Sequence, residues 1–229
     1  MCRRYYRSPH KPESSCLFGL SGIETARLFS NSKCDVSPAT FQPIILEQSD
    51  PASREIVIIR WGMIPRFAKS DVLYKARSTM NAKAETLTMR TMWSVPLHSG
   101  RCLVPVSGFY EWKVADIDRQ FYAVEMTDGR PFALAGLWDA WINPLTDQKI
   151  LSYSIITTDS NVLLHNVSTR MPAIIAASDY KRWLSRDCLN GPPDDLLRPF
   201  PPEKMKIVGA FNDYELQFEY SEKSQRGAF

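Results

Sequence analysis

The sequence is poor in cysteine and has no long apolar run. Its five cysteines are an odd number, and none stands in a CxxC or CxxH spacing, which argues against a disulfide framework and against a zinc site. No apolar stretch approaches the ~18 residues that a membrane-spanning helix needs, and the charged N-terminus is not followed by the apolar segment of a secretory signal. We therefore expect a protein of the reducing cytosol that binds no metal and contacts no membrane.

The excess of positive charge is small. The chain has 28 Lys and Arg against 25 Asp and Glu, a net charge of +3, which does not identify a nucleic-acid partner but is compatible with a local basic patch. With 229 residues, 44% of them apolar and 23% charged, it can bury a sizeable core, which excludes a disordered or collagen-like chain. Because the sequence has no repeat, we expect one domain over residues 1–218 and a polar, frayed tail over 219–229.

Short runs rich in β-branched and aromatic residues predict a sheet in the middle of the chain. Short turns separate these runs, so much of the sheet should be antiparallel. The expected strands are Glu55–Trp61, Arg101–Val106, Phe109–Lys113, Gln120–Met126, Phe132–Trp138 and Leu151–Thr157.

Helices are expected to be fewer. Ala82–Met92 contains good helix formers, and another helix is expected to begin with Ser178 as its N-cap. A short helix capped by Asp159 or Ser160 would end at Leu164, and residues 190–202 are expected to be loop with one helical turn. These elements predict an α+β fold, a single domain with a mostly antiparallel, curled, barrel-like β-sheet flanked by a few helices.

Cysteine at position 2 would become the N-terminal residue if Met1 were removed. An N-terminal cysteine carries an amine and a thiol on adjacent carbons, with ordinary pKa values of about 7.7–8.0 and about 8.5. Such a pair can attack an aldehyde twice, first forming an imine and then closing a five-membered thiazolidine. The alternative is that Cys2 stands there by chance, since cysteine mostly behaves as a small buried hydrophobe.

Seven segments that occur in order along the chain favour the functional interpretation of Cys2 over chance. Together they closely resemble the SRAP (SOS-response-associated peptidase) family, whose members shield abasic sites in single-stranded DNA, from Cys2 to about Ile175. The segments are Met1–Tyr5, Val36–Pro38, Arg60–Pro65, Asn81–Thr86, Arg101–Pro105, Gly108–Lys113 and Thr169–Pro172.

The resemblance implies a reaction and the residues that carry it. Cys2 matches the family's nucleophile, which is exposed by removal of Met1 and forms a thiazolidine with the ring-opened abasic sugar. Asn81 matches the asparagine that would hold the N-terminus or the sugar, and Glu111 matches the proton shuttle. The resemblance also implies a DNA surface formed by Arg4, Pro38, Trp61, Lys83, Trp112 and Arg170.

The sequence departs from the family pattern at two positions. Arg3 replaces the glycine that usually follows the cysteine, and Ser168 stands where the family has a histidine before the Arg-Met-Pro segment. His165 lies three residues earlier and is the only nearby imidazole, so it is the candidate for proton transfer, although a lone histidine is more often structural. Lys83 keeps the charge of the family's usual arginine but loses its bidentate fork.

Each site residue also has a simpler explanation. Glu111 could be a solvated strand residue paired with Lys113, and Asn81 could be a helix N-cap. A carboxylate among aromatic residues would instead have a raised pKa, as a general acid requires. Trp61 and Trp112 are more often core residues than stacking platforms.

The favoured hypothesis is a cytoplasmic or nucleoid-associated monomer that binds single-stranded DNA and crosslinks abasic sites through Cys2, without a metal or organic cofactor, in the DNA damage (SOS) response. One alternative is a peptidase that uses Cys2 and Glu111 as an N-terminal nucleophile system. Another is a single-stranded DNA-binding module that has lost the chemistry, given Arg3 and Ser168.

Overall fold

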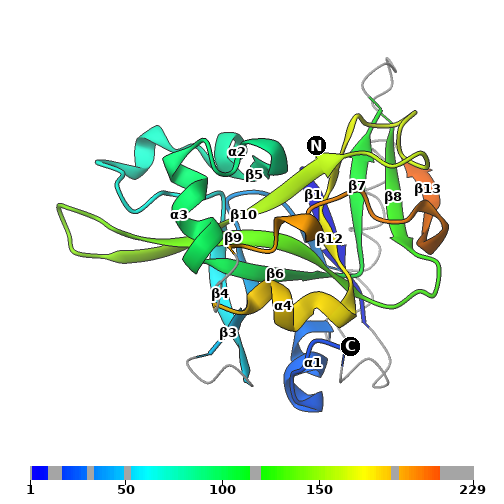
Figure 1. Cartoon of the computed structure of the whole chain (residues 1–229), viewed down its shortest axis with the longest axis horizontal. Helices are drawn as coiled ribbons and strands as arrows, with labels where there is room; N and C mark the ends of the chain where they lie inside the picture. The colour runs from blue at the N-terminus through cyan, green and yellow to red at the C-terminus, as the bar shows by residue number, and fades with distance from the viewer. Residues whose placement is uncertain are drawn as a thin grey trace, which may run out of the picture.

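A closed five-stranded barrel forms the centre of the molecule (Figure 1). The structure is a computed structural model, and it describes residues 2–9, 17–29, 34–48, 53–113, 120–186 and 191–211. The barrel strands are β3 (Phe41–Glu47), β4 (Arg54–Trp61), β6 (Arg101–Val106), β9 (Phe132–Ile142) and β10 (Lys149–Asp159). All neighbouring pairs in the ring are antiparallel except β10 and β4, which are parallel.

The parallel edge of β10 carries two partners in succession. β4 pairs with β10 as far as Trp61 opposite Tyr153, and β5 (Asn81–Lys83) continues on the same edge from Asn81 opposite Ile155. The chain leaves β4 at Gly62, where φ is +109° and a Cβ atom would lie 2.5 Å from the Cα of Ala76. Glycine alone fits this turn, and the turn lets the strand with Asn81 replace β4 on β10.

A second sheet carries the N-terminus. Its order is β13 (Met205–Phe211), β8 (Phe121–Met126), β7 (Gly108–Trp112), β1 (Arg4–Arg7) and β2 (Cys34–Val36), and all its pairs are antiparallel. The chain passes directly from β6 in the barrel to β7 in this sheet, and Gly108 makes room at the junction for the ring of Tyr6. Figure 1 shows β7, β8 and β13 side by side at one end of the molecule.

The remaining elements are short, and of these α3 and α4 pack against the barrel strands. The helices are α1 (Gly22–Phe29), α2 (Ala76–Thr79), α3 (Thr91–Ser99) and α4 (Tyr180–Leu184), the short strands are β11 (Arg170–Pro172) and β12 (Ile174–Ile175), and 3-10 turns span Asp71–Leu73, Ala84–Thr86, Ala177–Asp179, Asp194–Leu196 and Pro202–Lys204.

The alternation of side chains along the strands divides the core into two main layers. On β3, for example, Ile44 packs with Cys2, Tyr5 and other residues of the second sheet, whereas its neighbour Ile45 packs with residues of α1, α3 and α4. The first layer is therefore enclosed between the barrel and the second sheet, and it is the layer that contains Cys2. Its burial is the main force that holds the N-terminal strand in place.

The predicted fold class is confirmed, since the chain forms a single domain with a curled, mostly antiparallel barrel and few helices. All six predicted strands are present, several of them longer than expected. The helix predicted to begin at Ser178 is present as α4, but it begins at Tyr180 after a 3-10 turn, and the turn predicted within residues 190–202 is also present.

Two predicted helices are wrong. In place of a helix over Ala82–Met92, the chain forms β5, a 3-10 turn and then α3 from Thr91, because pairing with β10 outweighs the helix propensity of these residues. The expected helix after Asp159 is a turn at 162–167, where Asn161 accepts a hydrogen bond from the backbone of Leu164 and donates to Phe200. The predicted tail over 219–229 lies outside the described residues.

Candidate active site and DNA surface

The N-terminal strand places Cys2 inside the protein. β1 lies between β2 and β7, with Arg4 opposite Tyr110 and Tyr5 opposite Phe109. Cys2 has no exposed surface, and its Sγ donates to the backbone carbonyl of Arg4 at 3.6 Å. Burial raises the pKa of the Cys2 thiol well above its ordinary value, and the negative charge of nearby Glu111 acts in the same direction. The thiol is therefore neutral at physiological pH.

Asn81 is tied directly to Cys2. Its Nδ2 donates to the backbone carbonyl of Cys2 at 2.7 Å, across 79 residues of sequence. Its Oδ1 is buried, and no described residue donates a hydrogen bond to it. Because β5 begins at Asn81 on the edge of β10, the backbone of this residue is fixed and its side chain is directed at the N-terminal strand. The Nδ2 group of Asn81 thus holds the Cys2 carbonyl, and its Oδ1 can accept a hydrogen bond from a further donor.

Glu111 is a buried carboxyl next to Cys2. It is fully buried on β7, on the same face as Phe109, whereas Tyr110 and Trp112 pack against Phe121 on the other face. Burial raises the pKa of Glu111 to about 7, whereas the N-terminal amine, a hydrogen bond from Ser168 and the charge of Arg3 act in the opposite direction, the amine most strongly. The alternative of a solvated Glu111 paired with Lys113 is excluded by this burial. A carboxyl with this pKa can both accept and donate a proton near neutrality.

Ser168, and not His165, reaches the carboxyl of Glu111. The Ser168 hydroxyl is buried and lies within hydrogen-bonding reach of both the Glu111 carboxyl and, at 2.8 Å, the backbone carbonyl of Arg170, so its single proton serves one of these acceptors at a time. His165 lies in the turn at 162–167, with its side chain exposed. Ser168, and not the only nearby histidine, therefore contacts the buried carboxyl, but a serine hydroxyl cannot exchange protons near pH 7. The catalytic role of His165 stays a prediction.

The basic residues predicted to bind DNA lie near Cys2, but two of them are paired with carboxylates. Arg4 Nε contacts Asp35 Oδ2 at 3.0 Å, and Arg170 contacts both Glu85 and Asp159. These carboxylate partners were not predicted from the sequence. Asp159 stands opposite Arg170 in the pairing of β10 with β11, which only the topology reveals.

The other predicted DNA-binding residues differ in exposure. Lys83 is exposed, whereas Pro38, in the turn between β2 and β3, and Trp112 are half-buried. Trp61 is fully buried, and its Nε1 donates to the carbonyl of Met80 at 3.0 Å, with its ring 5.2 Å from that of Tyr5. Trp61 is thus a core residue in this conformation, and it has no surface on which a base could stack.

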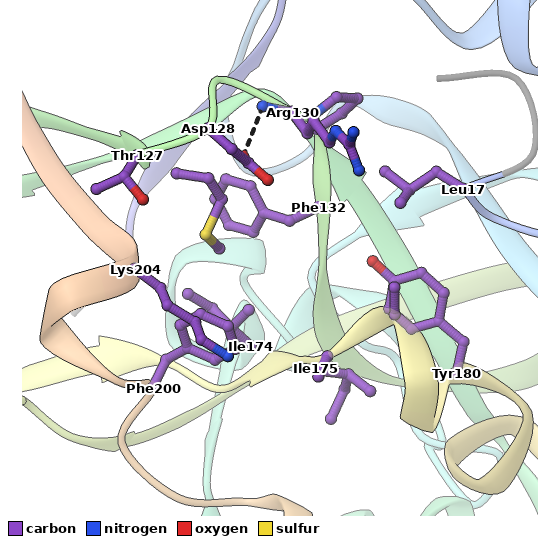
Figure 2. Close-up of a pocket in the computed structure, with 14 residues that line it drawn as sticks. Leu17, Thr127, Asp128, Arg130, Phe132, Ile174, Ile175, Tyr180, Phe200 and Lys204 are labelled. Carbon is purple, nitrogen blue, oxygen red and sulfur yellow. Dashed lines mark hydrogen bonds between the residues drawn. The ribbon is translucent and has the colours of Figure 1, made fainter. Parts of the chain in front are cut away.

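A pocket of about 400 Å³ lies apart from these residues, between the β8–β9 turn and the chain around β12 (Figure 2). Figure 2 shows Arg130 and Lys204 at its border, with Phe132, Ile174 and Tyr180 among its walls. None of the predicted catalytic or DNA-binding residues lines it. We therefore do not assign it to the candidate site.

In the described segments, no group of three His, Cys, Asp or Glu side chains could hold a metal ion. No helix within the same segments is long and apolar enough to cross a membrane.

Several known proteins are similar to this chain in sequence or in structure. YoqW of Bacillus subtilis, an abasic site processing protein, is 33% identical over 177 residues, which cover 75% of each chain. The abasic site processing protein HMCES of Xenopus tropicalis is 29% identical over 192 residues, which cover 72% of this chain and 57% of HMCES. A crystal structure of a Bacteroides thetaiotaomicron protein superposes with a TM-score of 0.78 at 26% identity over 94% of both chains.

The family assignment is shown by the match over nearly the whole chain. The profile of the family described as SOS response associated peptidase (SRAP) matches residues 1–210, which include all segments that carry the resemblance. The chain belongs to the SOS response associated peptidase (SRAP) family.

Proposed function

We propose that this protein binds single-stranded DNA and captures abasic sites covalently through Cys2 once Met1 has been removed. The observation that supports this most strongly is the grouping of Cys2, which precedes β1, with Asn81 of β5 and Glu111 of β7, together with a carboxyl pKa of about 7. The names of the relatives as abasic site processing proteins support the substrate. Such a protein acts in the DNA damage response, and we place it in the cytoplasm at the nucleoid.

The covalent step needs only the aminothiol and the aldehyde of the ring-opened sugar. The α-amine of Cys2 attacks the aldehyde carbon, and the carbinolamine loses water to give an imine. The thiol then adds to the imine carbon while its proton passes to nitrogen, which closes the thiazolidine. One water leaves in total, and nothing is oxidised or reduced. Because the thiol is held neutral by burial, the amine is the first nucleophile.

Glu111 serves as the proton shuttle in this scheme. Loss of water from the carbinolamine needs a proton on the departing oxygen, and closure of the ring moves a proton from sulfur to nitrogen. A carboxyl with a pKa of about 7 is present in both forms at neutral pH, so it can perform both transfers. Asn81 holds the carbonyl of Cys2, and its buried Oδ1 is placed to accept a hydrogen bond from the amine or the sugar.

Phosphate contacts from Arg3, Arg4, Lys83 and Arg170 would hold the strand without reading its sequence. Arg3 directly follows the buried nucleophile, Lys83 lies two residues after Asn81, and both side chains are exposed, so they can supply positive charge to a bound strand. Because Trp61 is buried, the remaining aromatic candidate for contact with the strand is Trp112, which is half-buried on the face of β7 opposite to Glu111.

The test is adduct formation with a single-stranded oligonucleotide that contains one abasic site. We expect a heat-stable, slower-migrating band with the wild-type protein, none with Cys2→Ala, and an unchanged band with Cys102→Ala. Cys102 is the matched control because it is also a free, fully buried cysteine whose pKa is raised by burial. An adduct in Cys2→Ala would refute the proposed nucleophile.

The outcome also separates the other hypotheses. Cleavage of added peptides that depends on Cys2 would indicate a peptidase, and salt-sensitive binding without any adduct would indicate a binding module. The intact mass of the purified protein must accompany each assay, because a retained Met1 blocks the amine.

A further inference from the structure

Both terminal nitrogens of Arg170 have internal partners, whereas its buried Nε has none among the described residues. Its Nη1 contacts Glu85 Oε1 and Asp159 Oδ1, both at 2.8 Å, and its Nη2 donates to Glu85 Oε2 at 3.0 Å and to the Thr157 carbonyl at 2.6 Å. The contact with Glu85 is therefore bidentate, the geometry in which a guanidinium binds carboxylate or phosphate best. All the outer donors of the fork are occupied before any DNA arrives.

The two carboxylates lie on the solvent side of this fork. The side chain of Arg170 is only 13% exposed, whereas those of Glu85 and Asp159 are 49% and 78% exposed. Hydrogen bonding from Arg170 holds the pKa of Glu85 below its ordinary value, and the charge of Lys83 contributes in the same direction. Glu85 is thus a carboxylate at neutral pH, and it covers the edge of the guanidinium that faces outward.

A DNA phosphate needs the same donors that Glu85 uses. The carbonyl of Thr157 belongs to β10 and stays where it is, but the exposed side chain of Glu85 can rotate into water. Binding of a phosphate to Arg170 is therefore an exchange of one anion for another.

We propose that Glu85 is a specificity-determining residue that competes with DNA phosphate for Arg170 and so weakens binding to undamaged single strands. This inference rests on the proposed function. A strand without an abasic site must displace Glu85 for a reversible contact, so it dissociates readily. A strand with an abasic site remains, because the bond to Cys2 makes its capture covalent. The ion pair thereby increases discrimination in favour of damaged DNA.

The experiment measures the affinity for a fluorescent oligonucleotide without abasic sites by anisotropy at several salt concentrations. Glu85→Gln should tighten binding by about 3- to 10-fold, since an ion pair of this kind contributes roughly that much. It should also steepen the slope of log affinity against log salt by about 0.7, the value for one phosphate contact on a single strand.

The matched control is Asp195→Asn. Asp195 makes an equivalent bidentate contact with Arg182, at 2.6 and 2.7 Å, and its substitution removes the same charge from a pair that is not near Cys2 in the sequence or in the site described above. We expect no change in affinity beyond the small effect of net charge. In the double variant Glu85→Gln/Arg170→Ala, the gain from Glu85→Gln should disappear.

Three results would overturn the inference. The first is an affinity of Glu85→Gln for DNA that equals that of Asp195→Asn. The second is an affinity weaker than that of the wild type, which would make Glu85 a positioning residue for Arg170. The third is a gain in affinity from Glu85→Gln that persists in the Arg170→Ala background. If wild-type protein still crosslinks abasic DNA in these cases, only the inference fails. If neither wild type nor Glu85→Gln binds single strands, the proposed function fails as well.

Discussion

Replacing Glu111 with glutamine should stabilise the protein at neutral and alkaline pH. Below pH 4.5 the carboxyl is protonated in both the folded and the unfolded chain. Between 4.5 and about 7 the unfolded chain releases this proton while the folded protein retains it, so the free energy of unfolding falls as pH rises. The interval of about 2.5 pH units corresponds to about 3 kcal/mol. Glutamine is never charged, so Glu111→Gln avoids this loss.

The same substitution should slow adduct formation. Glutamine fills the same space and can keep the hydrogen bond with Ser168, but it cannot transfer a proton. General acid–base catalysis contributes ~100-fold or more, so we expect the rate of crosslinking to fall by about that factor. The affinity for DNA should stay the same or increase slightly, since a negative charge is removed.

The assay compares urea unfolding of wild type and Glu111→Gln at pH 5, 6, 7 and 8, with crosslinking rates measured on the same samples. The difference in the free energy of unfolding should grow from pH 5 to pH 8. Glu203→Gln is the control, because Glu203 is exposed and its substitution should give a constant difference. Parallel curves for wild type and Glu111→Gln would refute the raised pKa, and equal crosslinking rates would refute the proton shuttle.

Four further substitutions test the surroundings of Cys2. Asn81→Ala removes the 2.7 Å hydrogen bond to the Cys2 carbonyl. A hydrogen bond contributes about 1 kcal/mol, so the rate of crosslinking should fall by roughly 5- to 10-fold while the affinity for DNA stays unchanged. Ser168→His should accelerate formation or reversal of the adduct, because an imidazole exchanges protons near pH 7. If instead His165→Ala slows crosslinking and Ser168→His has no effect, His165 performs the proton transfer. Arg4→Ala should weaken DNA binding equally for all base sequences and flatten the salt slope by about 0.7; an unchanged slope would place the DNA elsewhere.

Six of the thirteen strands in the described residues were predicted from the sequence because their β-branched or aromatic runs are separated by clear turn residues, whereas seven others, among them β1 and the barrel strand β3, were not predicted. The closure of the barrel was not predictable either, because it depends on the parallel pairing of Ser152 with Arg60 and of Ile155 with Asn81, which are far apart in the chain. This pairing also explains the incorrect helix over Ala82–Met92. Local propensity favours a helix there, but pairing with a strand more than 70 residues away in the sequence stabilises β5 instead.

The identities of the site residues came from the family resemblance, and their environments came only from the structure. No pattern in the sequence shows that Glu111 is fully buried or that Trp61 is a core residue. Both stand in strands where alternate residues face opposite sides, and the sequence does not reveal that both sides of β7 are covered. The pairing of Arg170 with Glu85 joins residues 85 positions apart, so it too required the fold.

The most direct test of the central claim is the mass of the isolated adduct, followed by peptide mapping. A thiazolidine through Cys2 predicts the mass of the protein without Met1 plus that of the abasic oligonucleotide, less one water, with the DNA remnant on the N-terminal peptide. It also predicts that the Cys2 thiol no longer reacts with iodoacetamide and that borohydride does not change the mass. A DNA remnant on any other peptide, or an adduct that gains two hydrogens with borohydride and retains a reactive Cys2 thiol, would contradict the account.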